Sequence, residues 1–397
     1  MDIYEMKNAI QNYAWGSKTF LPELMGNPEP SDKPQAELWM GTHIQGISQV
    51  KHITANETEW ISLAHLIQTN PQNILGSSVA NRFDKQLPFL FKVLAINHPL
   101  SIQVHPNRMQ AKKGYQFETQ KSYPLTESYR NFKDDQDKPE LICALTPLWA
   151  MCGFRPYDTI YKNFQSIENK LKIGLFKEDT IPFFFTNLMN LSQDNKIKLI
   201  DIAVRHASNN SVQEAHWQWV LNLSKQFPDD VGVLSPLFLN IVCLKPFEAL
   251  YIQPGILHAY LDGNAIEIMN NSDNVIRGGL TVKHIDIDTL LNIVNFNSEK
   301  LHYVHPTKIN PNEYCYQPPS DRFMLSRIDM SGDQSLEMNV QGPEILLCTK
   351  GEISIRQRNN VLPLKQGHSA FVAHSACQYH IEGKGEIFKG FVRNEDI

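Results

Sequence analysis

An alternating pattern in residues 99–106, Pro-Leu-Ser-Ile-Gln-Val-His-Pro, constrains the fold of this chain more than any other feature. On a β-strand, side chains two positions apart point to the same face. Gln103 and His105 therefore share one face, and apolar Ile102 and Val104 share the opposite face. The pattern predicts a strand on which an amide oxygen and an imidazole converge on one point.

Two further side chains could join this pair as metal ligands. Glu140 follows Lys138 and Pro139 and opens the apolar run 141–145, and His258 lies in the run 251–260, Tyr-Ile-Gln-Pro-Gly-Ile-Leu-His-Ala-Tyr. Such nitrogen and oxygen ligands suit a borderline divalent metal, with zinc as the first candidate. A single histidine on a strand is more often an ordinary core or surface residue, so the interpretation depends on the surrounding pattern.

That surrounding pattern resembles the metal-binding pattern of cupins. In cupins a His-x-His pair on one strand, a later Glu and a His after a Gly turn meet inside a barrel, and here Pro-Gly-x-x-His ends at His258. Gln103 stands in place of the first His of the pair. Glu140 follows His105 by 35 residues, so an insertion is expected between two strands that remain neighbours.

Composition restricts the classes of function. The chain has 397 residues, of which 42% are hydrophobic and 20% are charged, as in ordinary soluble proteins of two or three domains. The net charge of −5 and the lack of a Lys/Arg cluster argue against general nucleic-acid binding. A local basic pocket for an anionic small molecule is still compatible with this charge.

The same sequence predicts a cytoplasmic protein with no membrane contact. No apolar run approaches the ~20 residues that cross a bilayer, and the first residues, Met-Asp-Ile-Tyr-Glu, lack the features of a signal peptide. Six scattered cysteines without a Cys-x-x-Cys pair predict buried, reduced thiols. We expect a monomer or a weak oligomer.

The chain is predicted to be mainly β with α insertions, and to form two cupin-type jelly-roll barrels plus an inserted helical domain. Residues 36–54 and 87–105 have the composition of short strands, and 107–118 that of a short helix capped by Asn107. Apolar residues at three- and four-residue steps predict helices over 157–229. The predicted domains are a catalytic cupin domain in two parts (1–155 and 233–296), a helical insertion (156–232) and a C-terminal cupin-like domain (297–397).

A weak internal repeat supports a second β module. Residues 244–252 align with residues 364–372, which lie 120 positions later. In this register Gln378 stands where His258 stands in the first copy. The C-terminal module is therefore predicted to bind no metal.

Several runs along nearly the whole chain resemble the type I phosphomannose isomerase family. These runs are Gln11-Asn-Tyr-Ala-Trp-Gly16, Ala36-Glu-Leu-Trp-Met-Gly-Thr-His43, Leu87-Pro-Phe-Leu-Phe-Lys-Val-Leu94, Leu100-Ser-Ile-Gln-Val-His-Pro-Asn107, Lys138-Pro-Glu-Leu141 and the long motif from Glu267 to Asp286. The resemblance implies a zinc enzyme that interconverts mannose 6-phosphate and fructose 6-phosphate. It implies one zinc per chain, held by Gln103, His105, Glu140 and His258.

The resemblance also implies which residues act on the substrate. It implies active-site roles for Lys92, Lys138, Asp273 and Arg277. We predict that Arg277, Lys138 and Asp273 are catalytic and that Lys92, Ser101, Glu267, Lys283 and Trp15 bind the substrate. This chain departs from the family pattern at three positions: Asp137 stands where His is usual, Asn270 where Ala is common, and Val282 where Pro is common. Asp137 weakens any mechanism that needs a His there as an acid or base.

Aldose–ketose isomerisation through a cis-enediol needs a base at carbon and positive charge near a developing oxyanion. Lys138 lies two residues before Glu140 and would share its face, where a nearby metal ion eases loss of its proton. The plainer alternative is a solvated lysine beside a turn.

Arg277 offers a rigid fork for phosphate or an enediolate. Its plainer alternative is an ion pair with Asp273, four residues earlier. Lys92 lies within an apolar strand, where burial of an unpaired cation is costly, which favours a function. Lys283 is a weaker phosphate candidate, and Trp15 could equally pack in the core.

Two other classes of function compete with the isomerase. A sugar-binding or regulatory cupin without turnover would keep the barrel, but it would not need Lys138 and Arg277 together. A metal oxygenase would favour iron and His-rich ligation, which a Gln/His/Glu/His set does not match.

Overall fold

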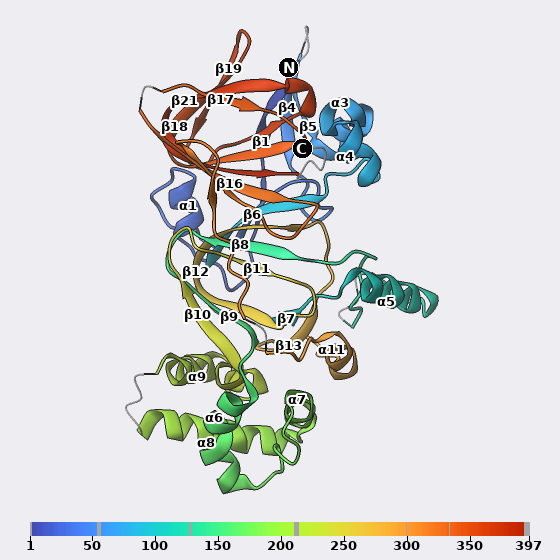
Figure 1. Cartoon of the computed structure of the whole chain (residues 1–397), viewed down its shortest axis with the longest axis vertical. Coiled ribbons are helices and arrows are strands. Elements are labelled where there is room, and N and C mark those ends of the chain that lie inside the picture. The colour runs from blue at the N-terminus through green and yellow to red at the C-terminus, as the bar shows by residue number, and fades with distance from the viewer. Residues whose placement is uncertain are drawn as a thin grey trace.

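Two antiparallel β-sheets form the frame of this computed structural model, and a group of helices lies at one end (Figure 1). The structure describes residues 2–53, 57–125, 127, 129–209, 214–298, 300–332 and 334–392. Among these residues, no helix combines the length and the apolar character that a membrane crossing requires.

The first sheet, called here the β12 sheet, carries the predicted metal ligands. Its main path runs β10-β9-β12-β6-β3-β2, with β7, β8, β11 and β13 paired beside it. The ten strands are β2 (Ala9–Gln11), β3 (Glu37–Met40), β6 (Phe89–Ile96), β7 (Ile102–Val104), β8 (Glu140–Ala144), β9 (Leu148–Phe154), β10 (Leu239–Leu244), β11 (Ala249–Ile252), β12 (His258–Asn270) and β13 (Ile276–Gly279).

The second sheet, the β21 sheet, combines strands from both ends of the chain. Its main path is β14-β15-β16-β21-β18-β20-β1-β4-β5, and β17 and β19 pair with β21 and β18. The eleven strands are β1 (Ile3–Lys7), β4 (Gln49–Ile53), β5 (Thr58–Ser62), β14 (Thr307–Lys308), β15 (Glu313–Tyr316), β16 (Met324–Ser331), β17 (Leu336–Asn339), β18 (Glu344–Gln357), β19 (Asn360–Lys365), β20 (Ser369–Val372) and β21 (Gln378–Phe391).

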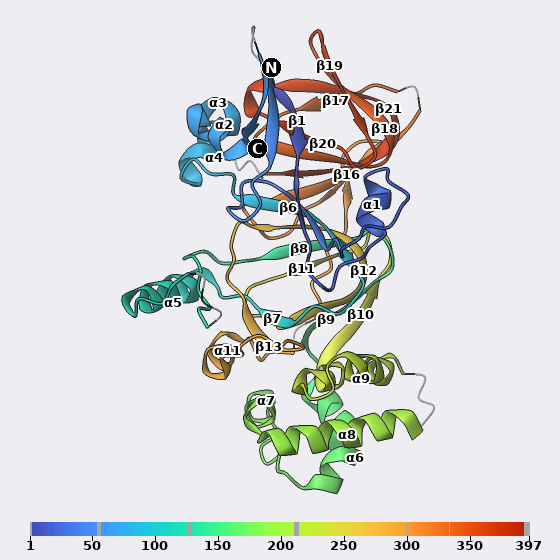
Figure 2. The same ribbon diagram turned by 180° about the vertical axis from the view of Figure 1, so that it is seen from behind.

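The helices lie outside the two sheets, and α6 to α9 form a separate group beyond β9 and β10 (Figures 1 and 2). The α-helices are α1 (Phe20–Leu24), α2 (Leu63–Thr69), α3 (Pro71–Leu75), α4 (Ser77–Arg82), α5 (Arg108–Gln120), α6 (Tyr157–Leu171), α7 (Ile181–Asn190), α8 (Gln193–Asn209), α9 (Ala215–Gln226), α10 (Ser235–Phe238) and α11 (Ile287–Ile293). Two short 3₁₀ helices are η1 (Val231–Leu234) and η2 (His374–Ala376).

Strand β6 shows how the sequence period divides the core. Phe89, Phe91 and Val93 are buried in the cluster that the β12 sheet shares with the β21 sheet. Leu94 and Ile96 are buried in a different cluster, on the other face. We call the face that carries Leu94 the inner face of the β12 sheet. Because side chains alternate, Lys92 points to this inner face with Leu94.

Strand β7 follows the alternation that the sequence predicts. Ile102 and Val104 are fully buried in the cluster that includes the cores of α6, α7 and α8. Gln103 and His105 therefore point to the inner face. The helical group therefore packs against the face of β7 opposite to Gln103 and His105.

Several sequence predictions are confirmed. The chain is mainly β with two antiparallel sheets, a cupin domain and a helical insertion. The predicted helix over 107–118 is α5, which begins after Asn107 with a capping box formed by Asn107 and Gln110. The 120-residue repeat matches the structure as well, because β12 starts at His258 and β21 starts at Gln378.

The prediction that every cysteine is buried is wrong. The six cysteines are free thiols, but only four of them are buried, and Cys243 and Cys377 are exposed. Cys243 lies on the outward face of β10, and Cys377 follows η2 in a left-handed conformation with φ of 57°.

Candidate metal centre

Three side chains from separate strands converge on the inner face of the β12 sheet. His105 directly follows β7, Glu140 is the first residue of β8, and His258 is the first residue of β12. One ligand atom from each lies within 4.8 Å of the others, and all three residues are buried. This group could hold one metal ion.

The hydrogen bonds of the two imidazoles show that a cation fits between them. His105 Nδ1 lies 2.7 Å from the Asn274 carbonyl oxygen, and His258 Nδ1 lies 2.9 Å from the Ile256 carbonyl oxygen. A carbonyl oxygen only accepts, so both Nδ1 atoms donate and, in the neutral rings, both Nε2 atoms present lone pairs. These Nε2 atoms face the Glu140 oxygens at 3.2 and 3.4 Å.

Lone pairs that face carboxylate oxygens repel one another unless a cation lies between them. His258 Nε2 is buried and has no hydrogen-bond partner among the described residues. Burial, and then the charge of Lys138, lower the pKa of His105 to about 4, so this ring is neutral near pH 7. Neutral imidazoles and an ionised carboxylate are the forms in which these side chains bind zinc.

Glu140 stays ionised despite its burial. Burial alone would raise the pKa of this carboxyl, but the charge of Lys138 and the contacts with His105 and His258 outweigh it and lower the pKa well below its usual range. Tyr260 Oη donates to Glu140 Oε2 at 3.2 Å. Such outer contacts orient metal ligands.

Sequence reasoning missed these outer contacts. Tyr260 lies two residues after His258, so the same rule that paired Gln103 with His105 could have identified it. Asn274 contributes through its backbone carbonyl, and its side chain also accepts from the backbone N–H of Lys133 and Asp134. No local sequence pattern predicts these side-chain contacts of Asn274, because Lys133 and Asp134 lie about 140 residues away in the sequence.

The predicted fourth ligand, Gln103, lies next to the other three. In the strand register Gln103 is directly opposite His258 on one side and Arg277 on the other. Residues directly opposite one another in an antiparallel pair point to the same face. Gln103, His258 and Arg277 therefore share the inner face.

Lys138 reaches the metal ligands, as its spacing from Glu140 predicts. Its Nζ lies 2.9 Å from Glu140 Oε1 and 3.5 Å from His105 Nε2, and only 9% of its side chain is exposed. The alternative of a solvated lysine beside a turn is therefore wrong.

Lys92 is buried beside this group, but it is not unpaired as the sequence argument assumed. Its Nζ lies 3.1 Å from Glu267 Oε2 and 3.3 Å from Glu37 Oε2. Burial would lower the pKa of Lys92, but the two carboxylates outweigh it and raise the pKa. Trp39 Nε1 also donates to Glu37 at 2.5 Å. Glu37 was not among the sequence candidates.

Asp273 and Arg277 do not pair with each other, so the structural alternative for Arg277 is wrong. Asp273 contacts His43 and Gln45, each at 3.1 Å. The Arg277 side chain has no hydrogen bond or ion pair within the described part of the chain, and burial lowers the pKa of its guanidinium. A partly buried cation without a partner can accept an anionic ligand.

The remaining candidates are half-buried or exposed. Lys283 is exposed overall, but its ammonium is partly desolvated. This desolvation and then the charge of Arg277 lower the pKa of Lys283. Ser101 is half-buried just before β7. Trp15 is half-buried, stacks on Tyr13 with ring centroids 5.9 Å apart, and packs against the inner-face cluster. Trp15 thus packs in the way that the plainer alternative describes.

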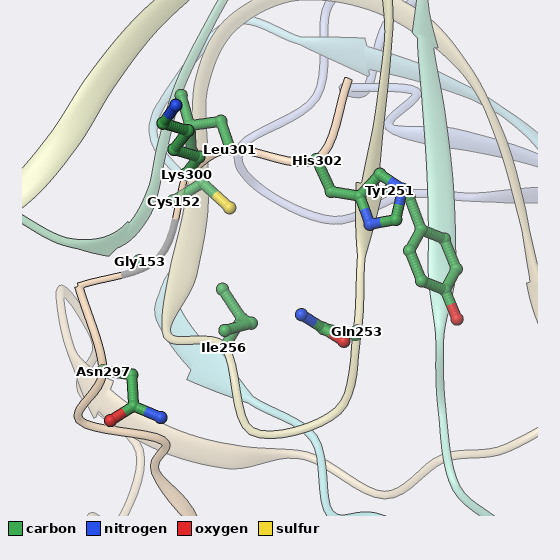
Figure 3. Close-up of a pocket in the computed structure, with 9 residues that line it drawn as sticks. All are labelled: Cys152, Gly153, Tyr251, Gln253, Ile256, Asn297, Lys300, Leu301 and His302. Atoms are coloured by element: carbon green, nitrogen blue, oxygen red, sulfur yellow. The ribbon is translucent and has the colours of Figure 1, made fainter. Parts of the chain in front are cut away.

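A cavity between the segment before β12 and residues 297–302 is too small for a sugar phosphate (Figure 3). Its volume is about 20 Å³, close to that of one water molecule. It is lined by Cys152, Gly153, Tyr251, Gln253, Ile256, Asn297, Lys300, Leu301 and His302.

Comparisons with known proteins place this arrangement in a family. Residues 3–157 match the phosphomannose isomerase type I catalytic domain, residues 169–239 match its helical insertion domain, and residues 314–392 match the mannose-6-phosphate isomerase cupin domain. Mannose-6-phosphate isomerase of Escherichia coli K12 is 38% identical over 387 residues, which cover 96% of this chain and 97% of that protein. The chain belongs to the type I phosphomannose isomerase family.

More distant relatives and solved structures agree. Human mannose-6-phosphate isomerase is 31% identical over 93% of this chain and 93% of its own length. A zinc-bound crystal structure of mannose 6-phosphate isomerase superposes with a TM-score of 0.91, at 38% identity, over 99% of this chain and all of that one. A single-substitution variant of phosphomannose isomerase from Salmonella typhimurium superposes with a TM-score of 0.92 at 36% identity. The resemblance predicted from the sequence motifs is confirmed.

Proposed function

We propose that this protein interconverts mannose 6-phosphate and fructose 6-phosphate as a zinc-dependent aldose–ketose isomerase. The observation that carries the proposal is the buried group of His105, Glu140 and His258, whose lone pairs converge where a cation is needed. The zinc-bound relative and the isomerases of the same family support the choice of metal and substrate.

One zinc ion per chain would be held by His105, Glu140 and His258, with Gln103 as the fourth ligand. The strand register supports Gln103, because it lies directly opposite His258. The chemistry that zinc supplies at such a site is Lewis acidity toward sugar oxygens that gain negative charge.

The reaction is an isomerisation, so the substrate and the product have the same atoms. A base takes the proton from C2 of the open-chain aldose, and the C2–H electron pair forms the C1–C2 double bond while the C1 oxygen gains a proton. The cis-enediol then gains a proton at C1 and loses the C2 hydroxyl proton, which leaves the ketose. We assign the proton transfer between C2 and C1 to Lys138, since its Nζ lies at the edge of the ligand group.

The charged residues around Lys138 have separate proposed roles. The Arg277 side chain has no partner among the described residues, so its guanidinium is free to stabilise the enediolate. Asp273 is proposed as the acid–base group of ring opening, because its carboxylate remains 30% exposed. Lys92 and Glu267 form the buried wall behind the sugar.

Three residues are proposed to contact the substrate away from the reacting carbons. Lys283 is exposed and close enough to Arg277 to feel its charge, which suits a phosphate contact. Ser101 would contact the sugar from the segment before β7, and Trp15 from the segment between β2 and β3.

The architecture that we infer for this function is two cupin-type jelly-roll domains with a helical insertion. The domain limits 1–155, 156–232, 233–296 and 297–397 agree in order with the three family matches. A cytoplasmic location and a monomeric or weakly associated state stay predictions of the sequence.

A coupled assay for fructose 6-phosphate formation, with zinc analysis on the same sample, tests the function. Turnover that depends on about one zinc per chain is expected. Binding of mannose 6-phosphate without turnover would instead identify a sugar-binding cupin.

A further inference from the structure

A buried histidine outside the predicted site, His43, contacts the partly exposed carboxylate of Asp273. His43 lies in the loop after β3 and is only 5% exposed. Its Nε2 lies 3.1 Å from Asp273 Oδ1. The plainer interpretation of a histidine at this position is packing, and the contact with a catalytic candidate changes that interpretation.

The hydrogen bonds of His43 determine which nitrogen carries its proton. The backbone N–H of Gln45 donates to His43 Nδ1 at 3.3 Å, so Nδ1 is an acceptor. A neutral ring then carries its proton on Nε2, which donates it to Asp273. His43 Nε2 therefore donates a hydrogen bond to Asp273 Oδ1.

The surrounding loop and ring contacts hold His43 in place. The loop closes through the hydrogen bonds from the Gly41 N–H to Ser48 Oγ and from the Gly46 N–H to the His43 carbonyl. The edge of the imidazole packs against Trp39, with ring centroids 4.8 Å apart. The donor is therefore preorganised before any substrate arrives.

Both carboxylate oxygens of Asp273 are occupied in a way that fixes their direction. Oδ1 accepts from His43, Oδ2 accepts from the Gln45 side chain at 3.1 Å, and the Asp273 backbone N–H donates to Asp134 Oδ2 at 3.0 Å. Burial would raise the pKa of Asp273, but the hydrogen bond and charge of His43 outweigh it and lower the pKa. The carboxylate is thus held as a base with a defined orientation.

We propose that His43 is a positioning residue of this isomerase, which orients the Asp273 carboxylate toward the sugar through its Nε2–H. The inference rests on the proposed function and adds a residue to it. His43 itself touches no reacting atom. It acts only through Asp273, and this makes the proposal separable from a general role in folding.

The test compares two substitutions of similar size in the coupled isomerase assay. His43→Leu removes the donor, and His43→Gln keeps an amide N–H near the position of Nε2. We expect His43→Leu to lower kcat/KM about 10- to 100-fold, the effect of losing a hydrogen bond to a charged group, mainly through kcat. His43→Gln should recover most of this loss, and both variants should keep wild-type zinc content.

A further test measures whether the effects of substitutions at His43 and Asp273 add together. In an Asp273→Asn background, His43→Leu should cost less than about threefold, because the group through which it acts is already changed. A full additional loss in that background, or equal losses for Leu and Gln, would overturn the proposal. If His43→Leu does not fold, His43→Phe, which keeps a ring against Trp39 and has no donor, gives the same comparison in the two Asp273 backgrounds. An inactive wild-type protein would instead refute the proposed function.

Discussion

Replacement of Arg277 with alanine separates a catalytic role from a structural one. Arg277 is partly buried, burial lowers its pKa, and it has no ion pair within the described residues. It is also directly opposite Gln103 in the strand register and so faces the metal ligands. The protein thus bears the cost of a desolvated guanidinium without an internal partner, which a substrate anion would offset.

The expected magnitudes follow from this environment. Loss of one donor that stabilises a transition-state oxyanion costs about 2.7–4 kcal/mol, so kcat/KM should fall about 10²- to 10³-fold. The free energy of unfolding should change by less than about 1 kcal/mol, because no ion pair is broken. Arg277→Lys should recover little, because an ammonium lacks the planar fork.

The measurements are kcat/KM in the coupled assay, zinc content and melting temperature on the same samples. Arg356→Ala is a matched control, because Arg356 is an exposed arginine of the β21 sheet paired with Glu382 at 2.8 Å. It should leave kcat/KM unchanged. A large fall in melting temperature with near-normal kcat/KM for Arg277→Ala would refute the catalytic reasoning.

Three other predictions concern the metal, the buried lysines and the thiols. Chelation should abolish turnover, and His258→Ala should leave less than one zinc per chain by metal analysis; full occupancy with normal rates would contradict the ligand assignment. Lys92→Met and Lys389→Met each leave buried carboxylates unpaired and should destabilise the protein by about 3–5 kcal/mol in denaturant titrations. Only the Lys389 variant should keep normal activity per folded, zinc-loaded chain. Alkylation of the native protein should label Cys243 and Cys377 first, and mass spectrometry that finds the other four labelled equally fast would argue against this burial.

The buried Lys389 also bears on the second β module. It lies 3.1 Å from Glu313 and 3.9 Å from Glu344, which opens β18 as Glu140 opens β8. Glu344 pairs across the sheet with Val372, and Glu140 pairs in the same way with Ile252. Ile252 and Val372 are equivalent positions of the 120-residue repeat. An ammonium therefore lies beside these two carboxylates of the second module, and the absence of a metal there stays a prediction of the sequence.

Local periodicity is enough to predict much of the site from the sequence. Alternation along β7 assigns Gln103 and His105 to one face of the strand without any knowledge of the partner strands. The spacing from Lys138 to Glu140 is informative for the same reason. The family motifs then identify His258 and the insertion that carries α5.

Only the tertiary structure decided which charges are paired. Lys92 is neutralised by Glu267, 175 residues away, and Asp273 is held by Gln45, 228 residues away. Sequence spacing carries no information on such contacts, because they depend on how distant strands are brought side by side. For that reason the sequence determined which residues could form the metal group, whereas the fold determined that the Arg277 side chain has no partner among the described residues and that His43 contacts Asp273.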